Sequence, residues 1–335
     1  MKQMLLTATL TVATVTPFTL SGADVPENPN RLSLGPRFGL NFKADFNNNA
    51  TYKTPTINPG PATGGADHTY DDGYVRVDSS GNAGNLTWNW GYKNPSQAVV
   101  DSMQFHAIRA SSPSSANDNP QYGTELLYQR IIGSLPASMR GRWGLEAGFG
   151  YTDLDLRNQR GGFVPVTTDT YPLNGVLPPS AGYNGTFSGP GALLGDTPVR
   201  TTTFASQSGR NKLSGDMFNL RFGPFAEWNL TRRLSFAASV GVTLAPTSVD
   251  YDFSETDTLA SGDRFSTSGH SSRSKVLYGP YVSGLLRYNF NPRWGLYVGA
   301  QFQNLTDLNQ SIGSRSARLD PGATLYGTVG VTWSF

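Results

Sequence analysis

Apolar and polar residues alternate along this sequence over unusually long stretches. Between Arg31 and Phe46 the even positions are apolar and the odd positions are polar or small. The same alternation recurs over 143–152, 234–244 and 324–335. Because successive side chains of a β-strand point to opposite faces, each segment predicts a strand with one apolar and one polar face.

The length of these strands separates two all-β architectures. A soluble β-sandwich also alternates, because one face of each sheet packs in a core. Its strands typically have ~5 to 6 residues, whereas ~9 to 11 tilted residues cross a bilayer. The segments here are of the longer kind, and their polar face carries mostly Gly, Ser, Thr and Asn. We therefore expect an all-β fold, an antiparallel transmembrane β-barrel.

The connections between the predicted strands alternate between short and long. The short ones are 229–233 and 289–293, and 134–141 is of modest length. The long ones are rich in Gly, Ser, Thr and Asn; they are 157–214, 254–273 and 306–320. Outer-membrane barrels have this asymmetry, with short periplasmic turns and long extracellular loops.

Four tryptophans lie on the apolar faces of predicted strands, three beside a short connection and one beside the C-terminus. They are Trp143, Trp228, Trp294 and Trp333. Amphipathic aromatic rings are stabilised at a membrane–water interface. The four residues therefore predict an aromatic girdle on the periplasmic side.

The two ends of the chain carry the features of an exported barrel. Residues 1–23 have a Lys near the start, an uncharged stretch and a Ser-Gly-Ala site, which predicts a cleaved signal peptide. The chain ends on alternating apolar residues, Val329, Val331, Trp333 and Phe335. This ending resembles the assembly signal of Gram-negative outer-membrane β-barrel proteins. The resemblance implies insertion by the barrel assembly machinery, and a small barrel of outer-membrane protein A or X type.

The strand count follows from an even total, since both termini are expected in the periplasm. Segments 31–46 and 122–133, with six later ones, account for eight strands. A hairpin of 86–92 and 99–109 would add two more. We expect ten strands, with eight as the alternative. Bulges or kinks are expected at Gly35-Pro36, Gly223-Pro224 and Gly279-Pro280, because Pro removes a ladder donor.

The overall composition excludes several function classes. The chain has 335 residues, no Cys, and 26 Lys and Arg against 24 Asp and Glu. This balance argues against nucleic-acid binding. The absence of Cys excludes disulfides, Cys-ligated zinc and thiol nucleophiles. We expect no metal and no cofactor.

Charged residues on the inward-facing positions predict a polar network inside the barrel. They are Arg37, Lys43, Glu125, Glu146, Arg221, Glu227 and Arg287. Side chains largely fill barrels of eight to ten strands, so these groups predict ion pairs that plug the lumen. A small gated pore, in which the pairs exchange partners, is the alternative.

Hydrolytic chemistry has few candidates. The chain resembles the omptin proteases in size and in its predicted export; these use an Asp pair and an Asp-His pair at the extracellular rim. Asp71-Asp72 could stand for the Asp pair, and His68 and His270 are the histidines considered, but Ser268 stands where the family has Asp. A lipase-like Ser-His arrangement has no distinctive spacing here. We assign no catalytic residue.

The sequence therefore predicts a signal peptide over 1–23 and one outer-membrane barrel domain over 24–335. Its expected partners are outer-membrane lipid and lipopolysaccharide, the assembly machinery, and an unidentified extracellular ligand. The expected role is structural or loop-mediated interaction, through 47–85 and 157–214. A small solute or ion channel is the first alternative, and a rim hydrolase of omptin or lipase type is the second.

Overall fold

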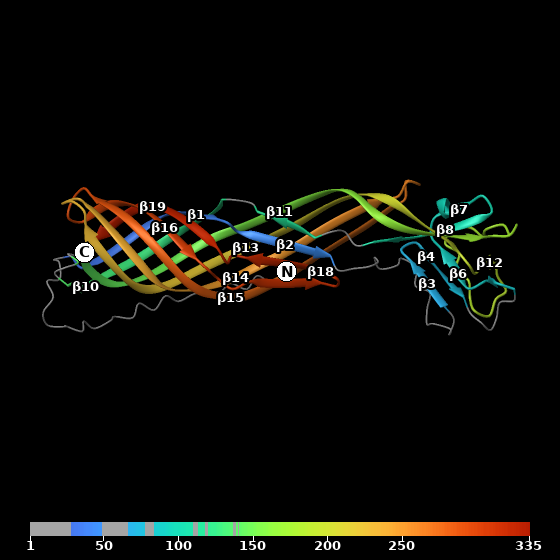
Figure 1. Cartoon of the computed structure of the whole chain (residues 1–335), viewed down its shortest axis with the longest axis horizontal. Coiled ribbons are helices and arrows are strands. Elements are labelled where there is room, and N and C mark those ends of the chain that lie inside the picture. Colours follow the sequence, from blue (N-terminus) through green and yellow to red (C-terminus); the bar gives the residue numbers. More distant parts are fainter. Residues whose placement is uncertain are drawn as a thin grey trace, which may run out of the picture.

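A computed structural model describes residues 28–48, 66–77, 84–109, 113–117, 120–136, 139 and 141–335. The predicted signal peptide lies outside these residues. The described chain is all-β, apart from one 3-10 turn, η1 at Pro95–Gln97. The molecule is elongated, with a strand ring at one end and a small group of short strands at the other (Figure 1).

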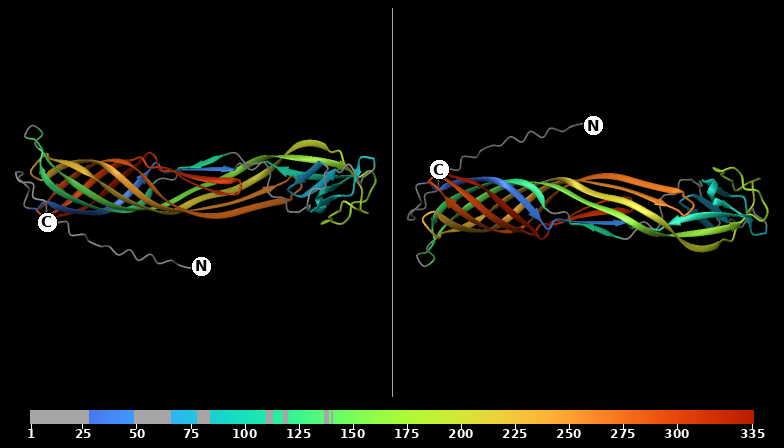
Figure 2. Two further views of the ribbon diagram at one scale, coloured as in Figure 1. Left: turned by 90° about the horizontal axis from the view of Figure 1, so that it is seen from below. Right: turned by 90° about the horizontal axis from the view of Figure 1, so that it is seen from above.

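Eight antiparallel strands close the ring. In chain order they are β1 (Asn30–Leu40), β10 (Gln121–Ser134), β11 (Arg142–Pro172), β13 (Val199–Asn229), β14 (Leu234–Thr258), β15 (Arg264–Asn289), β16 (Trp294–Gln303) and β19 (Thr324–Ser334). The pairing of β1 with β19 joins the first and last strands, and the pairing of β10 with β11 completes the closure. Figure 2 shows the tilted strands wrapping around one interior. Closure removes free edges from the ring.

The ten-strand expectation is wrong for the described residues. β1 pairs directly with β10, with Asn30 opposite Arg130, so no strand from 86–109 lies between them. That segment instead forms β5 (Leu86–Thr87), β6 (Trp90–Tyr92), β7 (Ala98–Val99) and β8 (Ser102–Ile108). β8 pairs with the far end of β11, over 166–172. It is too short to cross a bilayer, which takes ~9 to 11 residues.

Most residues of the segments expected to be long loops are strand instead. β11 and β13 each run for 31 residues and pair continuously to Thr170 and Val199, so most of 157–214 is strand. β14 and β15 likewise pair as far as Thr258 and Arg264. Gly, Ser and Thr suggested loops, yet an antiparallel partner hydrogen-bonds the backbone groups that point toward it along such a hairpin. Residue composition alone could not reveal that partner.

Three smaller sheets lie outside the ring, and two of them have more than two strands. One consists of β2 (Lys43–Asn48), β9 (Ser114–Ala116), β17 (Leu308–Ile312) and β18 (Arg315–Asp320). The other, with β3 (Ala66–Tyr70), β4 (Gly73–Val77) and β6, lies at the far end with β8 and β12 (Leu194–Gly195) (Figure 1). We call this group of short strands, with the connection 173–198, the distal domain.

The polarity of the strand faces reverses along the molecule. Over the ring, the outward side chains are large, apolar and exposed; this belt includes Leu34, Phe149, Leu220, Val242, Val282, Val298 and Val329. On β16 the belt runs from Trp294 to Phe302. About nine residues of strand, at ~3.3 Å each and a tilt of ~40°, span ~23 Å, close to the ~25 Å height of the apolar band of outer-membrane barrels.

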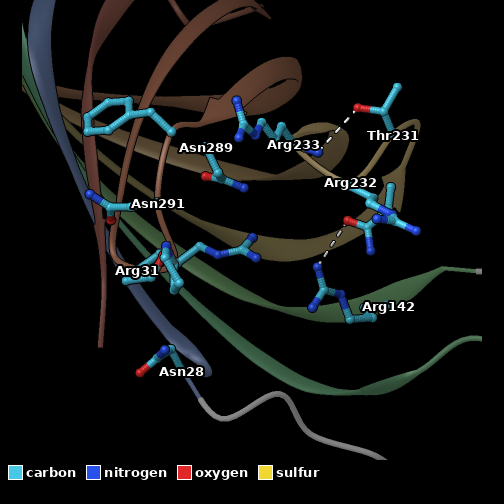
Figure 3. Close-up of a pocket in the computed structure, with 12 residues that line it drawn as sticks. Asn28, Arg31, Arg142, Thr231, Arg232, Arg233, Asn289 and Asn291 are labelled. Carbon is cyan, nitrogen blue, oxygen red and sulfur yellow. Dashed lines mark hydrogen bonds between the residues drawn. The ribbon is translucent and has the colours of Figure 1, made fainter.

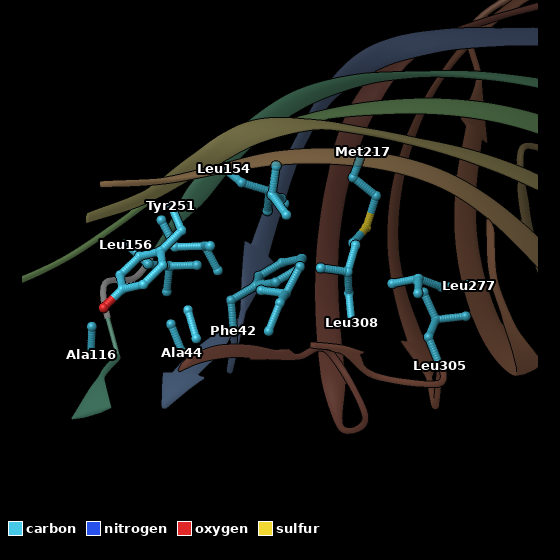
Figure 4. Close-up of a cluster of buried hydrophobic side chains, with 14 of the residues drawn as sticks. Phe42, Ala44, Ala116, Leu154, Leu156, Met217, Tyr251, Leu277, Leu305 and Leu308 are labelled. Carbon is cyan, nitrogen blue, oxygen red and sulfur yellow. The ribbon is translucent and has the colours of Figure 1, made fainter. Parts of the chain in front are cut away.

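Beyond the belt the apolar side chains turn inward. On β11, outward Phe149 gives way to inward Leu154 and Leu156, while Asp153 and Asp155 face outward or lie partly exposed. The inward apolar set forms one buried cluster, which we call the apolar plug: Phe42, Leu154, Leu156, Leu213, Met217, Val249, Leu277, Leu305 and Leu308 among others (Figure 4). Each such side chain stabilises the fold by ~1.5–3 kcal/mol.

The three Gly-Pro pairs lie in strands that keep their register, so they do not form the expected bulges. The pairing of β1 with β19 stays in register from Leu34 to Arg37, across Gly35-Pro36. A Cβ on Gly35 would lie 2.0 Å from the Val329 carbonyl oxygen, and one on Gly223 would lie 2.1 Å from that of Val240. Gly279 approaches a neighbouring carbonyl in the same way. Glycine is therefore required for close strand approach beside each proline.

In the described part of the chain, no helix is long and apolar enough to cross a membrane.

Candidate functional site

The interior of the ring contains a network of charges, built from alternate positions on β1, β10, β11, β13 and β15. Its first centre is Glu227 on β13, which accepts hydrogen bonds from three guanidinium groups. Arg142 donates at 2.7 Å, Arg287 at 3.0 Å, and Arg31 also contacts this carboxylate. Glu227 is inaccessible to solvent, so the three cations compensate the desolvation of one anion.

The second centre is Glu125 on β10. Arg221 donates to it at 3.0 Å, and the Arg37 guanidinium lies 3.7 Å from its other oxygen. Arg37 also stacks over the Tyr326 ring, 3.3 Å from the centroid, a cation–π contact. These contacts connect β1, β10, β13 and β19 across the interior.

The third centre is Glu146 on β11. It accepts hydrogen bonds from Gln129 at 2.9 Å, Ser239 at 2.8 Å and the Tyr281 hydroxyl at 3.0 Å. Arg287 donates to Gln129 at 2.6 Å, so this centre and that of Glu227 belong to one network. Six of the seven predicted lumen charges thus lie together inside the ring.

Lys43 does not belong to this network, contrary to the sequence-based assignment. It lies on β2, is about half exposed and pairs with Asp45 at 2.9 Å. The reason is a break in the strand: β1 ends at Leu40, and Asn41 has a φ of 64°. Face alternation does not continue through such a turn, and Phe42, predicted to face outward, is fully buried in the apolar plug.

Sequence reasoning missed several members of the network. Arg31 shares the odd parity of Arg37, and Arg142 shares the even parity of Glu146, so the alternation rule could have found both. Ser239 and Tyr281 also face inward, but nothing in their residue type marks them as partners of Glu146. Their role depends on the closure of the ring.

The four tryptophans lie where the strands meet the short connections. Trp294 pairs with Trp333 across β16 and β19, with ring centroids 6.3 Å apart, and Trp333 stacks on Phe335 at 4.5 Å. Trp228 stacks on Phe236 at 6.2 Å, and Trp143 is partly exposed. Val329 and Val331 are exposed on the same face of β19. A membrane interface at this level remains a prediction.

The distal domain has an aromatic core, and the carboxylate of Asp169 is buried beside it. Tyr70, Trp90, Tyr92, Phe105 and Tyr171 belong to this core. Asp169 accepts hydrogen bonds from Tyr70 at 2.7 Å and, through both oxygens, from Arg200 at 2.7 and 2.8 Å. Burial would raise the pKa of Asp169, but the hydrogen bonds from Arg200 and Tyr70 outweigh it, and the pKa is lowered.

The adjacent Asp71-Asp72 pair is structural in its contacts. Asp71 accepts the backbone N–H of Ile108 at 2.7 Å, and Asp72 accepts that of His106 at 2.8 Å. Asp72 also lies 2.6 Å from Nδ1 of His106, a histidine that sequence reasoning did not select. Both carboxylates are buried, and their hydrogen bonds hold the β3–β4 turn against β8.

His270 has an acidic partner that local sequence could not reveal. Asp252 stands directly opposite it on β14, with Oδ1 2.8 Å from His270 Nδ1. The other ring nitrogen, Nε2, lies 3.3 Å from the Ser272 hydroxyl, which also donates to Asp250 at 2.5 Å. The cluster is exposed on the outer face beyond the belt, and the Asp252 hydrogen bond raises the pKa of His270.

A cavity of about 780 Å³ opens at the end of the ring where the short turns lie (Figure 3). We call it the turn-end cavity. Its lining includes four arginines, Arg31, Arg142, Arg232 and Arg233, and the asparagines Asn28, Asn229, Asn289 and Asn291. Its lining includes no Asp or Glu. Among the described residues, no group of three or more His, Asp or Glu is arranged to hold a metal ion.

Comparisons with known proteins find only weak similarity to solved structures. No family model and no curated protein matches the chain. Among solved structures, Ail, the attachment invasion locus protein of Yersinia pestis, is 9% identical over 92% of this chain and 100% of its own, with a TM-score of 0.28. The P. putida toluene transporter TodX is 10% identical over 92% and 91%, with a TM-score of 0.20.

OmpT, an outer membrane protein of Vibrio cholerae, is 8% identical over 91% of this chain and 98% of its own, with a TM-score of 0.14. These neighbours are outer-membrane β-barrel proteins. The identities and TM-scores are low, so no functional residue is transferred from them.

Proposed function

We propose that this chain is an outer-membrane β-barrel that holds a rigid extracellular stalk, and that the distal domain on this stalk contacts a partner outside the cell. The observation that supports this proposal most strongly is the reversal of face polarity. The ring is apolar outside and charged inside, whereas the strands beyond it are polar outside and apolar inside. The first arrangement fits lipid and the second fits water.

The same reversal argues against conduction. The interior is filled at two successive levels, first by the Glu125, Glu146 and Glu227 network and then by the apolar plug. Buried, paired charges are held in fixed positions, and a closely packed apolar core excludes water. Solutes would have to displace both layers. We therefore favour a role in presentation and interaction over a channel.

Planar-bilayer recording of the refolded mature chain tests the closed interior. Inserted protein should give no discrete conductance steps. A Leu154→Gly, Leu213→Gly double variant removes two side chains of the apolar plug and leaves the charge network intact. If the network alone closes the ring, this variant should also show no conductance. Reproducible ohmic steps from the unmodified chain would favour the channel.

A surface hydrolase is a second candidate, supported by one specific observation. Asp252 and Ser272 contact opposite ring nitrogens of His270, Nδ1 and Nε2, as in an acid–base–nucleophile set. For Ser272 to act as the nucleophile, its hydroxyl hydrogen must turn from Asp250 to Nε2. Incubation of the refolded chain with a fluorescent fluorophosphonate tests it. Labelling that requires both Ser272 and His270, and survives Ser274→Ala on the same strand, would support hydrolysis. Equal labelling of wild type and Ser272→Ala would exclude Ser272 as the nucleophile.

A further inference from the structure

The charge balance inside the ring is uneven near the turn-end cavity. Glu227 is surrounded by Arg31, Arg142 and Arg287, three cations for one anion. Arg31 and Arg142 line the cavity while they contact Glu227. Each guanidinium has five N–H donors, so the one contact of Arg31 and the two of Arg142 do not exhaust either group. An excess of positive charge thus faces the opening from within.

Two further cations stand at the rim of the same cavity. Arg232 and Arg233 occupy the turn between β13 and β14, and both side chains are exposed. Figure 3 shows Arg31, Arg142, Arg232 and Arg233 around one opening. The only hydrogen bond given by the Arg233 guanidinium among described residues is a long one, 3.5 Å, to the Tyr288 hydroxyl. Neither rim arginine is paired with a described carboxylate.

The asparagines of the lining supply neutral donors and acceptors next to these cations. Asn229 already accepts a hydrogen bond from Arg142 at 3.2 Å, and Asn291 caps the turn by accepting from the backbone N–H of Trp294 at 2.7 Å. The C-terminal Phe335 lies at the same end, where its carbonyl oxygen accepts from the Asn30 N–H at 3.1 Å. The site is therefore held by turns and strand ends that are themselves hydrogen-bonded.

We propose that the turn-end cavity binds a phosphate-bearing anion. Guanidinium groups match phosphate oxygens with two parallel donors, and four of them converge here on a space large enough for several phosphate groups. The anion is either free in solution or the headgroup of an anionic lipid. This site is at the opposite end of the molecule from the distal domain, so it does not depend on the function proposed above.

Titration calorimetry with the refolded full mature chain tests the proposal. In neutral detergent, sodium tripolyphosphate is the free probe. Nanodiscs containing phosphatidylglycerol, compared with nanodiscs of phosphatidylcholine, are the headgroup probe, monitored by a fluorophore on Leu230→Cys, an exposed position of the β13–β14 turn outside the cavity lining. We expect saturable binding to at least one probe, weakened as salt screens the charges.

The diagnostic variant is Arg232→Gln, Arg233→Gln, which removes two exposed cations and leaves the Glu227 contacts intact. It should weaken binding by about tenfold or more. The matched control is Arg210→Gln, Arg264→Gln, which removes the same charge from exposed positions beyond the belt and should leave affinity unchanged. Equal weakening by both pairs, or no binding of either probe by the wild-type chain, would overturn the proposal.

Discussion

Glu146 and Leu154 lie on the same inward face of β11, yet Glu146 accepts hydrogen bonds from polar side chains of three other strands and Leu154 is packed in the apolar plug. The two side chains mark the two halves of the molecule. Around Glu146 the outside of the ring is apolar, and around Leu154 it is polar. β11 therefore has an apolar outer face at the level of Glu146 and a polar outer face at the level of Leu154.

This reversal predicts that an arginine placed on the outer face destabilises the protein within the belt and has little effect beyond it. Val242→Arg places a charge in the belt and should lower the free energy of unfolding in lipid by ~2–4 kcal/mol. Ser268→Arg, on exposed β15 beyond the belt, should change it by less than ~0.5 kcal/mol. Urea titration of both variants in liposomes measures the difference. Similar effects at the two positions would place the membrane boundary elsewhere.

The all-β ring and most of its interior charges could be predicted from alternation, because parity is a local property of a strand. The prediction that Lys43 faces the lumen was wrong because the alternation of strand faces is interrupted at Asn41, where φ is positive. The extended strands could not be foreseen, since Thr-rich residues such as 199–206 become strand through pairing with a partner far along the chain. The Asp252–His270 contact likewise joins residues brought together by register alone.

Removing the charge of Glu227 should destabilise the ring strongly. Glu227→Gln leaves Arg31, Arg142 and Arg287 without their shared anion, and breaking a buried pair costs ~3–5 kcal/mol. The matched control, Asp307→Asn, breaks an exposed contact with Arg318 and should cost less than ~1 kcal/mol. Denaturant unfolding of the refolded chain compares them. Equal stability of the two variants would show that the network does not support the ring.

The Asp252 contact predicts an altered titration of His270. The Asp252 carboxylate stabilises the protonated imidazole, so the pKa of His270 should lie above its ordinary value of about 6.5. Any stabilisation from this pair is present at pH values below the unfolded pKa and disappears as the pH rises through the folded pKa. Histidine NMR titration measures it. Asp252→Asn should lower the pKa, and an unchanged value would contradict the contact.

The buried Asp169 predicts acid sensitivity of the distal domain. Its folded pKa is lowered, so its contribution to stability is present above the ordinary Asp pKa of about 3.9 and disappears as the pH falls through the folded value. Asp169→Asn removes the charge that Tyr70 and Arg200 hold, and amide hydrogen exchange around Phe105 should accelerate at neutral pH. Exchange in β16, inside the ring, is the internal control. Unchanged exchange at Phe105 would show that the pair does not order this domain.

Labelling of single cysteines tests whether the belt lies in the membrane, with the distal domain and the turn-end cavity on opposite sides of it. The chain has no native Cys, so each introduced Cys reports alone. Val100 is 98% exposed in the distal domain, Arg232 lies at the turn-end cavity, and Val242 lies in the belt. A bulky, membrane-impermeant maleimide should label Val100→Cys on intact cells and Arg232→Cys only after the outer membrane is permeabilised. Val242→Cys should react only after unfolding. Labelling of Val242→Cys in the folded protein, or of Arg232→Cys before Val100→Cys, would contradict the proposed position of the belt and the proposed orientation of the chain.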